Sequence, residues 1–201
     1  MKTNHRKYVG GRWEKVGKRQ LELMIEMRLK PKHKFLDIGC GSLRGGRLFI
    51  NYLDKGNYYG IDHHKWLIDA GVKYELEGKD RKKEPNFLIN GDFDFSLFKT
   101  RFDFALASSL FTHLTKDKIK QCVDNLLPVM YSRGVFYASI FKGKSDKNRA
   151  ESCDTKKFFY HIEEIRELSS GWKIEALNQV PSRILRGRYF FYQTMLKFTK
   201  L

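Results

Sequence analysis

The sequence is poor in cysteine and proline and contains no long hydrophobic run. Its 3 cysteines, Cys40, Cys122 and Cys153, form no C-x-x-C pair, and none lies near a histidine pair at zinc-site spacing. These absences predict no disulfide framework and no metal site, and they favour a reducing compartment. No stretch approaches the roughly twenty apolar residues of a membrane-spanning helix, and the opening residues, MKTNHRKYVGGRW, lack the apolar core of a signal peptide. We therefore expect a cytoplasmic protein without a membrane span.

The low proline content, 4 residues, also excludes several non-globular classes. Hydrophobic residues make up 41% of the chain and aromatic residues 14%, which excludes collagen-like, proline-rich and disordered chains. A length of 201 residues suits one domain with a sizeable core. We expect a single domain over 1–201.

Acidic residues are scarce, with 23 Asp and Glu against 39 Lys and Arg, so the net charge is +16. Two basic zones stand out: Lys2, Arg6, Lys7, Arg12, Lys15, Lys18 and Arg19 near the N-terminus, and Arg183, Arg186, Arg188, Lys197 and Lys200 near the C-terminus. A basic excess gathered on one face would attract polyanions such as RNA, or anionic lipid head groups. The alternative is a lysine-rich composition spread over a solvated surface, and charge alone leaves both open.

Short apolar runs recur along the chain, at 35–38, 58–61, 87–89, 102–107 and 135–141. Continuous apolar runs are typical of strands that are covered on both faces, as in a parallel sheet.

Segments with helical spacing separate some of these runs. Apolar residues recur at one-turn spacing over 48–53, and a longer apolar stripe covers 119–130. We expect two crossover helices here, the second capped by Thr115 and ended by the Ser-Arg-Gly of 132–134. The β-α-β order predicts an α/β fold.

The pattern changes after residue 141. A helix is expected at 162–168, stopped by Gly171, and two strands follow at 172–177 and 189–198. The linker between them, which contains Pro181, is too short for a helical crossover, so these strands should pair antiparallel.

The most informative segment is FLDIGCGSLRGG, residues 35–46. An apolar strand leads directly into closely spaced glycines and then a helix, which is typical of a nucleotide-type site at the carboxyl end of a first strand. Asp37 lies two residues before Gly39, where its charge would repel a dinucleotide pyrophosphate. The third glycine of the dinucleotide pattern falls at Arg44, so that pattern is absent. A ligand with an ammonium-bearing amino acid tail, such as S-adenosylmethionine, is favoured over NAD.

Two further acids follow later strands. Asp62 ends the second strand about twenty residues beyond the glycines, where its carboxylate can accept hydrogen bonds from both ribose hydroxyls. Asp92 follows the third strand, where it could accept a hydrogen bond from the adenine amine while Phe93 covers the ring.

With these motifs in this order, the sequence resembles the class I S-adenosylmethionine-dependent methyltransferases over 35–141, and more loosely over the terminal hairpin. The resemblance implies a seven-stranded Rossmann-like α/β sheet, mostly parallel with a C-terminal antiparallel hairpin, and helices on both faces. It also implies an arm and helix in 1–30 that cover the active site, a cofactor-binding core in 34–141, and a C-terminal helix and hairpin in 142–201. The GGRWEKVG segment of the arm is similar to a branch of small bacterial-type members with mostly unassigned substrates.

The resemblance implies that Asp37 and the glycines contact the methionine portion of S-adenosyl-L-methionine, that Asp62 contacts ribose and that Asp92 faces adenine. S-adenosyl-L-homocysteine would be the product. The residues expected at the cofactor are Asp37, Gly39, Cys40, Gly41, Asp62, His63, Gly91, Asp92, Phe93, Ala107 and Ser108. One departure is Leu43, where many members carry a glycine.

Each candidate has a simpler interpretation. Asp37 could cap the next helix, and Asp62 and Asp92 could form turns at strand ends. Asp94 competes with Asp92 for the adenine position. Cys40 is expected to be a small packing residue rather than a nucleophile.

Methyl transfer from a sulfonium is an in-line displacement, so a general base is needed only for a protonated acceptor. His113 is the histidine that the motif order places near the methyl group, although it could instead cap or hydrogen-bond a loop. Candidate walls of the acceptor pocket are Tyr8, Trp13, Tyr137 and Phe141, any of which could be ordinary core.

The sequence therefore predicts a methyltransferase that acts on a small molecule or on a glycan or lipid precursor, as a monomer or homodimer. An RNA-directed methyltransferase that uses the basic termini is the first alternative. A non-catalytic binding protein with the same fold is the second.

Overall fold

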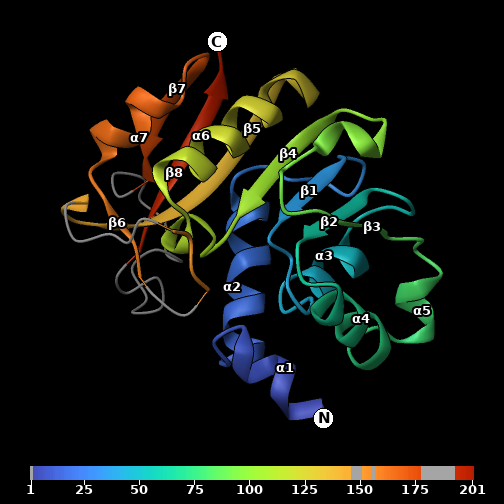
Figure 1. Cartoon of the computed structure of the whole chain (residues 1–201). Coiled ribbons are helices and arrows are strands. Elements are labelled where there is room, and N and C mark those ends of the chain that lie inside the picture. The colour runs from blue at the N-terminus through green and yellow to red at the C-terminus, as the bar shows by residue number, and fades with distance from the viewer. Residues whose placement is uncertain (1, 146–150, 155–156, 178–192) are drawn as a thin grey trace. The chain divides into compact units, whose positions relative to one another are not determined.

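A computed structural model of the chain describes residues 2–145, 151–154, 157–177 and 193–201. The chain forms two compact units, residues 1–91 and 92–201 (Figure 1). Among the described residues, no helix is long and apolar enough to cross a membrane.

The first unit combines three parallel strands with five helices among its described residues. The strand order is β3-β2-β1. In chain order the elements are α1 (Lys2–Tyr8), α2 (Trp13–Glu26), β1 (Phe35–Ile38), α3 (Gly46–Tyr52), β2 (Tyr58–Asp62), α4 (Lys65–Tyr74), α5 (Gly78–Arg81) and β3 (Asn86–Ile89). The expected strands at 35–38, 58–61 and 87–89 and the first crossover helix are confirmed.

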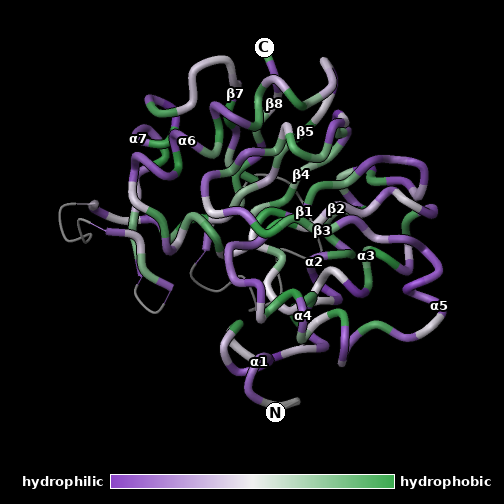
Figure 2. The backbone as a smooth tube through the Cα atoms, turned by 45° about the vertical axis from the view of Figure 1, so that its right-hand side comes forward, coloured by the Kyte–Doolittle hydropathy of each residue, from purple (hydrophilic) through white to green (hydrophobic). Residues whose placement is uncertain are grey.

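Burial explains the apolar run of β1, since all four of its residues are buried. Figure 2 shows this strand as a largely hydrophobic segment. Asp37 pairs in register with Gly60 of β2, and Ile38 pairs with Ile61. Because the strands are parallel, their carboxyl ends share one edge, and the acids Asp37 and Asp62 lie at that edge.

The second unit is a mixed sheet with the strand order β4-β5-β8-β7, and β6 pairs with β5. β4 and β5 are parallel, whereas β8 runs antiparallel to both β5 and β7. The elements are η1 (Phe95–Phe98), β4 (Phe102–Ala107), η2 (Phe111–His113), α6 (Lys116–Leu126), η3 (Leu127–Val129), β5 (Met130–Lys142), β6 (Phe159–Tyr160), α7 (Ile162–Leu168), β7 (Trp172–Ala176) and β8 (Gln193–Lys200). The short strand β6 adds to the seven that were expected.

The C-terminal expectations are confirmed where the structure describes them. α7 has the expected bounds, Gly171 adopts a left-handed φ of 84° before β7, and β7 and β8 pair antiparallel. Phe111, Phe136, Trp172 and Phe198 pack as an aromatic core in this unit. Pro181, residues 189–192 of the last expected strand, and Arg183, Arg186 and Arg188 of the basic zone lie outside the described residues.

The expected end of the second crossover helix is wrong. α6 ends at Leu126, and β5 already begins at Met130, so residues 132–134 lie inside a strand rather than at a helix end. Pro128 explains the difference, because proline lacks the N–H that a continuing α-helix needs and its ring clashes with the preceding turn. Thr115 is the N-cap residue of α6 as expected, but its side chain makes no capping hydrogen bond.

In the first unit, α2 packs directly on the loop after β1 through Gly17. A Cβ atom at this position would overlap the backbone carbonyl oxygen of Arg44. Gly78, at the exposed start of α5, has no neighbouring atom within 4 Å of its would-be Cβ.

These two helical glycines make a matched pair of substitutions. We expect Gly17→Ala to lower the free energy of unfolding by about 1–3 kcal/mol, because backbone must move to admit the methyl group. Gly78→Ala should raise it by about 0.5 kcal/mol, because alanine restricts only the unfolded chain there. Urea unfolding followed by circular dichroism measures both, and equal effects of the two variants would contradict the close packing of α2 on the loop.

Candidate functional site

The carboxylate of Asp37 is buried at the end of β1. The Tyr58 hydroxyl, from the neighbouring strand β2, donates to its Oδ2 at 2.8 Å. Burial raises the pKa of Asp37 to about 7, and the negative charge of Asp62 adds to this rise, whereas the Tyr58 hydrogen bond and the charge of Arg44 lower it. The structure therefore buries an acid at a strand end without a full counter-charge.

The glycines after β1 turn the chain sharply across the end of β2. Gly39 and Gly41 adopt left-handed φ values of 73° and 52°, which favour glycine. The amides of Gly39 and Cys40 both donate to the Ile61 carbonyl, at 2.8 and 3.0 Å. A Cβ at Gly41 would lie 3.0 Å from the side chain of Val9 in the N-terminal arm, so this side chain packs closely on the backbone of Gly41.

The structure explains why position 43 carries leucine where many proteins of the resembled family carry glycine. Its φ of 66° is left-handed, which is the conformation that a glycine would adopt without strain. The side chain is fully buried beside Gly46 and Gly71, where a Cβ would lie within 3 Å of Leu43 atoms. Burying a leucine contributes about 1.5–3 kcal/mol, which outweighs a left-handed strain of about 1–2 kcal/mol.

The later glycines allow two further close approaches. A Cβ at Gly46 would lie 2.5 Å from the Tyr58 hydroxyl, and one at Gly45 would overlap the side-chain oxygen of Gln20. Gly46 therefore leaves room for the hydroxyl that donates to Asp37.

Cys40 is a buried packing residue, as the sequence predicts. Burial and the negative charge of Asp37 raise the pKa of its thiol well above the usual range, so the thiol stays protonated and is a poor nucleophile. Its Sγ faces Gly60, where a Cβ would lie 3.1 Å away.

Asp62 connects the end of β2 to the loop between β1 and α3, residues 39–45, which we call the glycine loop. Its Oδ2 accepts from the amide of Gly41 at 2.9 Å, and its Oδ1 accepts from the amide of His64 at 2.9 Å. A carboxylate offers about four lone-pair positions, so further acceptor capacity remains on both oxygens. The Nδ1 atoms of His63 and His64 lie 3.9 and 3.4 Å from Oδ1.

The N-terminal arm lies on this loop within the first unit. The half-buried Arg44 guanidinium donates to the carbonyls of Val9, at 2.6 Å, and Gly11, at 3.3 Å. Burial lowers the pKa of Arg44 to about 10, so it stays charged at neutral pH. Arg6 of α1 forms a two-pronged ion pair with Glu75, with contacts of 2.8 and 2.6 Å.

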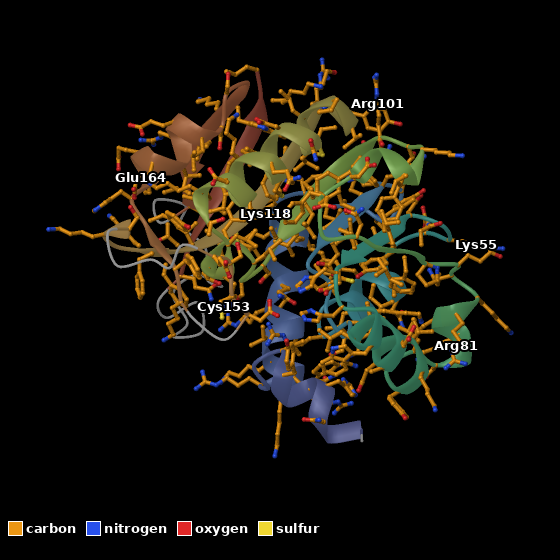
Figure 3. All side chains as sticks on the ribbon, in the orientation of Figure 1. Lys55, Arg81, Arg101, Lys118, Cys153 and Glu164 are labelled. Carbon is orange, nitrogen blue, oxygen red and sulfur yellow. The ribbon has the colours of Figure 1, made fainter. Side chains whose placement is uncertain are left out.

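The candidates after β3 differ in exposure. A Cβ at Gly91 would contact the Cβ of His63 at 3.4 Å. Asp92 is 76% exposed and lies 3.3 Å from the Nζ of Lys118, which is labelled in Figure 3, and Phe93 is buried with a φ of 56°. Asp94 accepts from the amide of Ser96 and caps η1, which gives it a structural role.

His113 follows β4 in the second unit. Its Nδ1 lies 3.2 Å from the carbonyl oxygen of Cys153, and its own carbonyl accepts from the Cys153 amide at 3.0 Å. These contacts match the alternative in which the histidine hydrogen-bonds a loop, and a catalytic role stays a prediction. Ala107 is buried and Ser108 is half-buried at the end of β4.

The four proposed pocket residues lie in different environments. Tyr8 is exposed, and Trp13 is buried in edge contact with His5 and beneath the Arg6 guanidinium. Tyr137 and Phe141 are buried on β5. Their assignment as pocket walls stays a prediction.

Sequence reasoning missed two partners of the site. Tyr58 donates to Asp37, but in the sequence it is one more aromatic residue of an apolar strand. Arg44 stood out only as a missing glycine, whereas the structure uses it to bind the arm.

Comparison with known proteins identifies the fold. No protein-family model matches the chain. Its structure is similar to magnesium protoporphyrin IX methyltransferase (ChlM) from Synechocystis PCC 6803 with bound SAM, with a TM-score of 0.68 and 14% identity over 98% of this chain and 89% of that chain.

Two further structures have the same fold. The glycopeptide N-methyltransferase MtfA complexed with SAM matches with a TM-score of 0.68 and 13% identity, over 92% of this chain and 94% of that chain. A TehB-like SAM-dependent methyltransferase from Corynebacterium glutamicum ATCC 13032 Kitasato matches with a TM-score of 0.64 and 19% identity, over 98% and 92%. The chain has the class I methyltransferase fold, so the predicted fold class is confirmed.

The raised pKa of Asp37 predicts a pH-dependent stability. The carboxyl ionises near pH 3.8 in the unfolded chain but near pH 7 in the folded one, so the folded state binds the proton more tightly and loses stability as the pH rises between these values. Asp37→Asn should therefore gain stability relative to the parent on going from pH 5 to pH 8, by roughly 2–3 kcal/mol.

Urea unfolding at both pH values measures this difference. Asp69→Asn, which removes an exposed carboxylate on α4, is the control and should shift equally at both. A stability difference between Asp37→Asn and the parent that is the same at pH 5 and pH 8 would contradict the burial of an unneutralised acid.

Proposed function

We propose that the protein is an S-adenosyl-L-methionine-dependent methyltransferase whose cofactor binds at the glycine loop after β1 and at the acid that ends β2. The observation that carries the proposal is the pair of buried carboxylates, Asp37 and Asp62, at one edge of two adjacent parallel strands. The fold supports it, because the three similar proteins named above are methyltransferases.

The buried carboxylate at the end of β1 fits this cofactor. An ammonium group placed near Asp37 would supply the counter-charge that the buried acid lacks, whereas a pyrophosphate would add a second negative charge. Arg44 does not compete for the role, because its guanidinium donates to the carbonyls of Val9 and Gly11.

The second acid fits a ribose. The amides of Gly41 and His64 fix the plane of the Asp62 carboxylate and use one acceptor position on each oxygen. The remaining positions can accept hydrogen bonds from two neighbouring hydroxyls. The proposed contacts of His63, Gly91, Asp92, Phe93, Ala107 and Ser108 with the cofactor extend this assignment from the sequence pattern.

The cofactor supplies a methyl group on a positively charged sulfur. The chain's own contribution is to orient this group and to exclude water, and the arm that lies on the glycine loop suits the second task. For an acceptor that arrives protonated, we assign His113 as the group that accepts the proton.

We propose a small molecule, or a glycan or lipid precursor, as the acceptor. Magnesium protoporphyrin IX and glycopeptide acceptors in the names of two similar proteins support this class. The net charge of +16 favours RNA as the second candidate acceptor, because phosphate contacts by lysine and arginine supply affinity.

The cofactor site is tested by calorimetry with S-adenosyl-L-homocysteine. We expect Asp62→Ala to weaken binding at least tenfold, because hydrogen bonds to a charged group contribute about 1.5–3 kcal/mol each. Asp69→Ala removes an exposed acid from α4 and should leave the affinity unchanged. Absence of binding to the folded parent protein would refute the proposal.

The acceptor class is tested with methyl-labelled S-adenosylmethionine and a fractionated cell extract. The proposal predicts label in the small-molecule, lipid or glycan pool. Label in RNA would instead assign the basic residues to acceptor binding, and that binding should weaken steeply as salt is raised.

A further inference from the structure

Three consecutive residues at the end of β2 place metal-ligating atoms together. The carboxylate of Asp62 and the imidazoles of His63 and His64 offer one ligand atom each, and these atoms lie within 4.8 Å of one another. We propose that they form a binding site for a divalent transition-metal cation of the zinc class, and that the cation and the cofactor's ribose exclude each other.

The two distances from the histidine nitrogens to Asp62 are close to those around a coordinated ion. Metal–ligand bonds of about 2.1 Å at tetrahedral angles separate two ligand atoms by about 3.4 Å. His64 Nδ1 and Asp62 Oδ1 are 3.4 Å apart, and His63 Nδ1 is 3.9 Å from the same oxygen. The side chain of His63 is 53% exposed, so its ring can move the remaining half ångström or so.

The surrounding contacts orient two of the three ligands, Asp62 and His64. Asp62 is oriented by the amides of Gly41 and His64. The Nε2 of His64 lies 3.3 Å from the hydroxyl of Tyr8, so this nitrogen can carry the proton and donate to Tyr8 while Nδ1 keeps a lone pair for the ion. Such an outer partner of a ligating histidine sets its tautomer and ring orientation.

The chemistry of the ligands selects the ion. Two imidazoles and one carboxylate suit Zn²⁺, Ni²⁺ or Cu²⁺, whereas Mg²⁺ and Ca²⁺ favour sites made of oxygen ligands. The exposure of His63 leaves room for water at the remaining coordination position. The sequence predicted no metal site because adjacent ligands follow none of the usual zinc spacings.

The exclusion of the cofactor rests on the proposed function. A cation on Asp62 Oδ1 occupies the acceptor capacity that we assign to a ribose hydroxyl. Free zinc would then act as a competitive inhibitor of cofactor binding.

The test is calorimetric titration of Zn²⁺ into the full, tag-free chain carrying Cys153→Ser, which removes the only described cysteine that is not buried. We expect one bound ion per chain. The double variant His63→Ala/His64→Ala and the single variant Asp62→Asn should each weaken binding at least tenfold. Tyr8→Phe should weaken it severalfold, because the histidine loses its outer partner.

His33→Asn is the matched control, because the asparagine oxygen can still accept from the Lys30 amide as His33 Nδ1 does. It should bind Zn²⁺ like the parent. Circular dichroism of each variant separates lost ligands from lost folding, and Asp62→Asn, which preserves side-chain shape, keeps the test decisive if the double variant unfolds. Failure to bind Zn²⁺, or undiminished binding by the folded variants, would overturn the metal site.

A second titration uses S-adenosyl-L-homocysteine with and without saturating Zn²⁺. The proposal predicts an affinity at least tenfold weaker in the zinc-loaded protein, and an unchanged affinity would overturn the mutual exclusion. If the zinc-free protein does not bind S-adenosyl-L-homocysteine, the proposed function fails, while the Zn²⁺ titration still decides the metal site.

Discussion

The burial of two carboxylates at one edge of a parallel sheet is the constraint on which the site depends. An ionised acid taken from water is costly unless hydrogen bonds or a counter-charge offset the lost hydration. The structure satisfies Asp62 with two backbone amides, but it gives Asp37 one hydroxyl and only a partial offset from the charge of Arg44, and the pKa of Asp37 rises to about 7. A cationic ligand beside Asp37 would remove this cost, so binding and stability are linked at one residue.

The surrounding chain is built to bring these groups together. Gly46 admits the hydroxyl that donates to Asp37, and the left-handed turn at Gly41 aims its amide at Asp62. Arg44 attaches the N-terminal arm to the same loop. The glycine loop therefore connects the acids, the second strand and the arm, and a substitution that shifts this loop would disturb all three.

The fold followed from the sequence because buried parallel strands leave continuous apolar runs, which the residues of β1 and β4 show plainly. The end of α6 was missed because the apolar stripe continues past Pro128, and the backbone restriction of that proline outweighs the stripe. Asp37 and Asp62 were visible as acids at strand ends. The partner Tyr58 was not, and Tyr8 was predicted only as a pocket wall and not as a partner of His64, because long-range contacts of aromatic side chains leave no periodic signal.

The most direct test of this account is the affinity for S-adenosyl-L-homocysteine between pH 5 and pH 8. If the ligand's ammonium binds the ionised form of Asp37, affinity should rise by up to about tenfold per pH unit below pH 7 and level off above it, where the acid is mostly ionised. Asp37→Asn should bind weakly and without this slope. A parent affinity that is constant from pH 5 to pH 8 would contradict the role assigned to the buried acid.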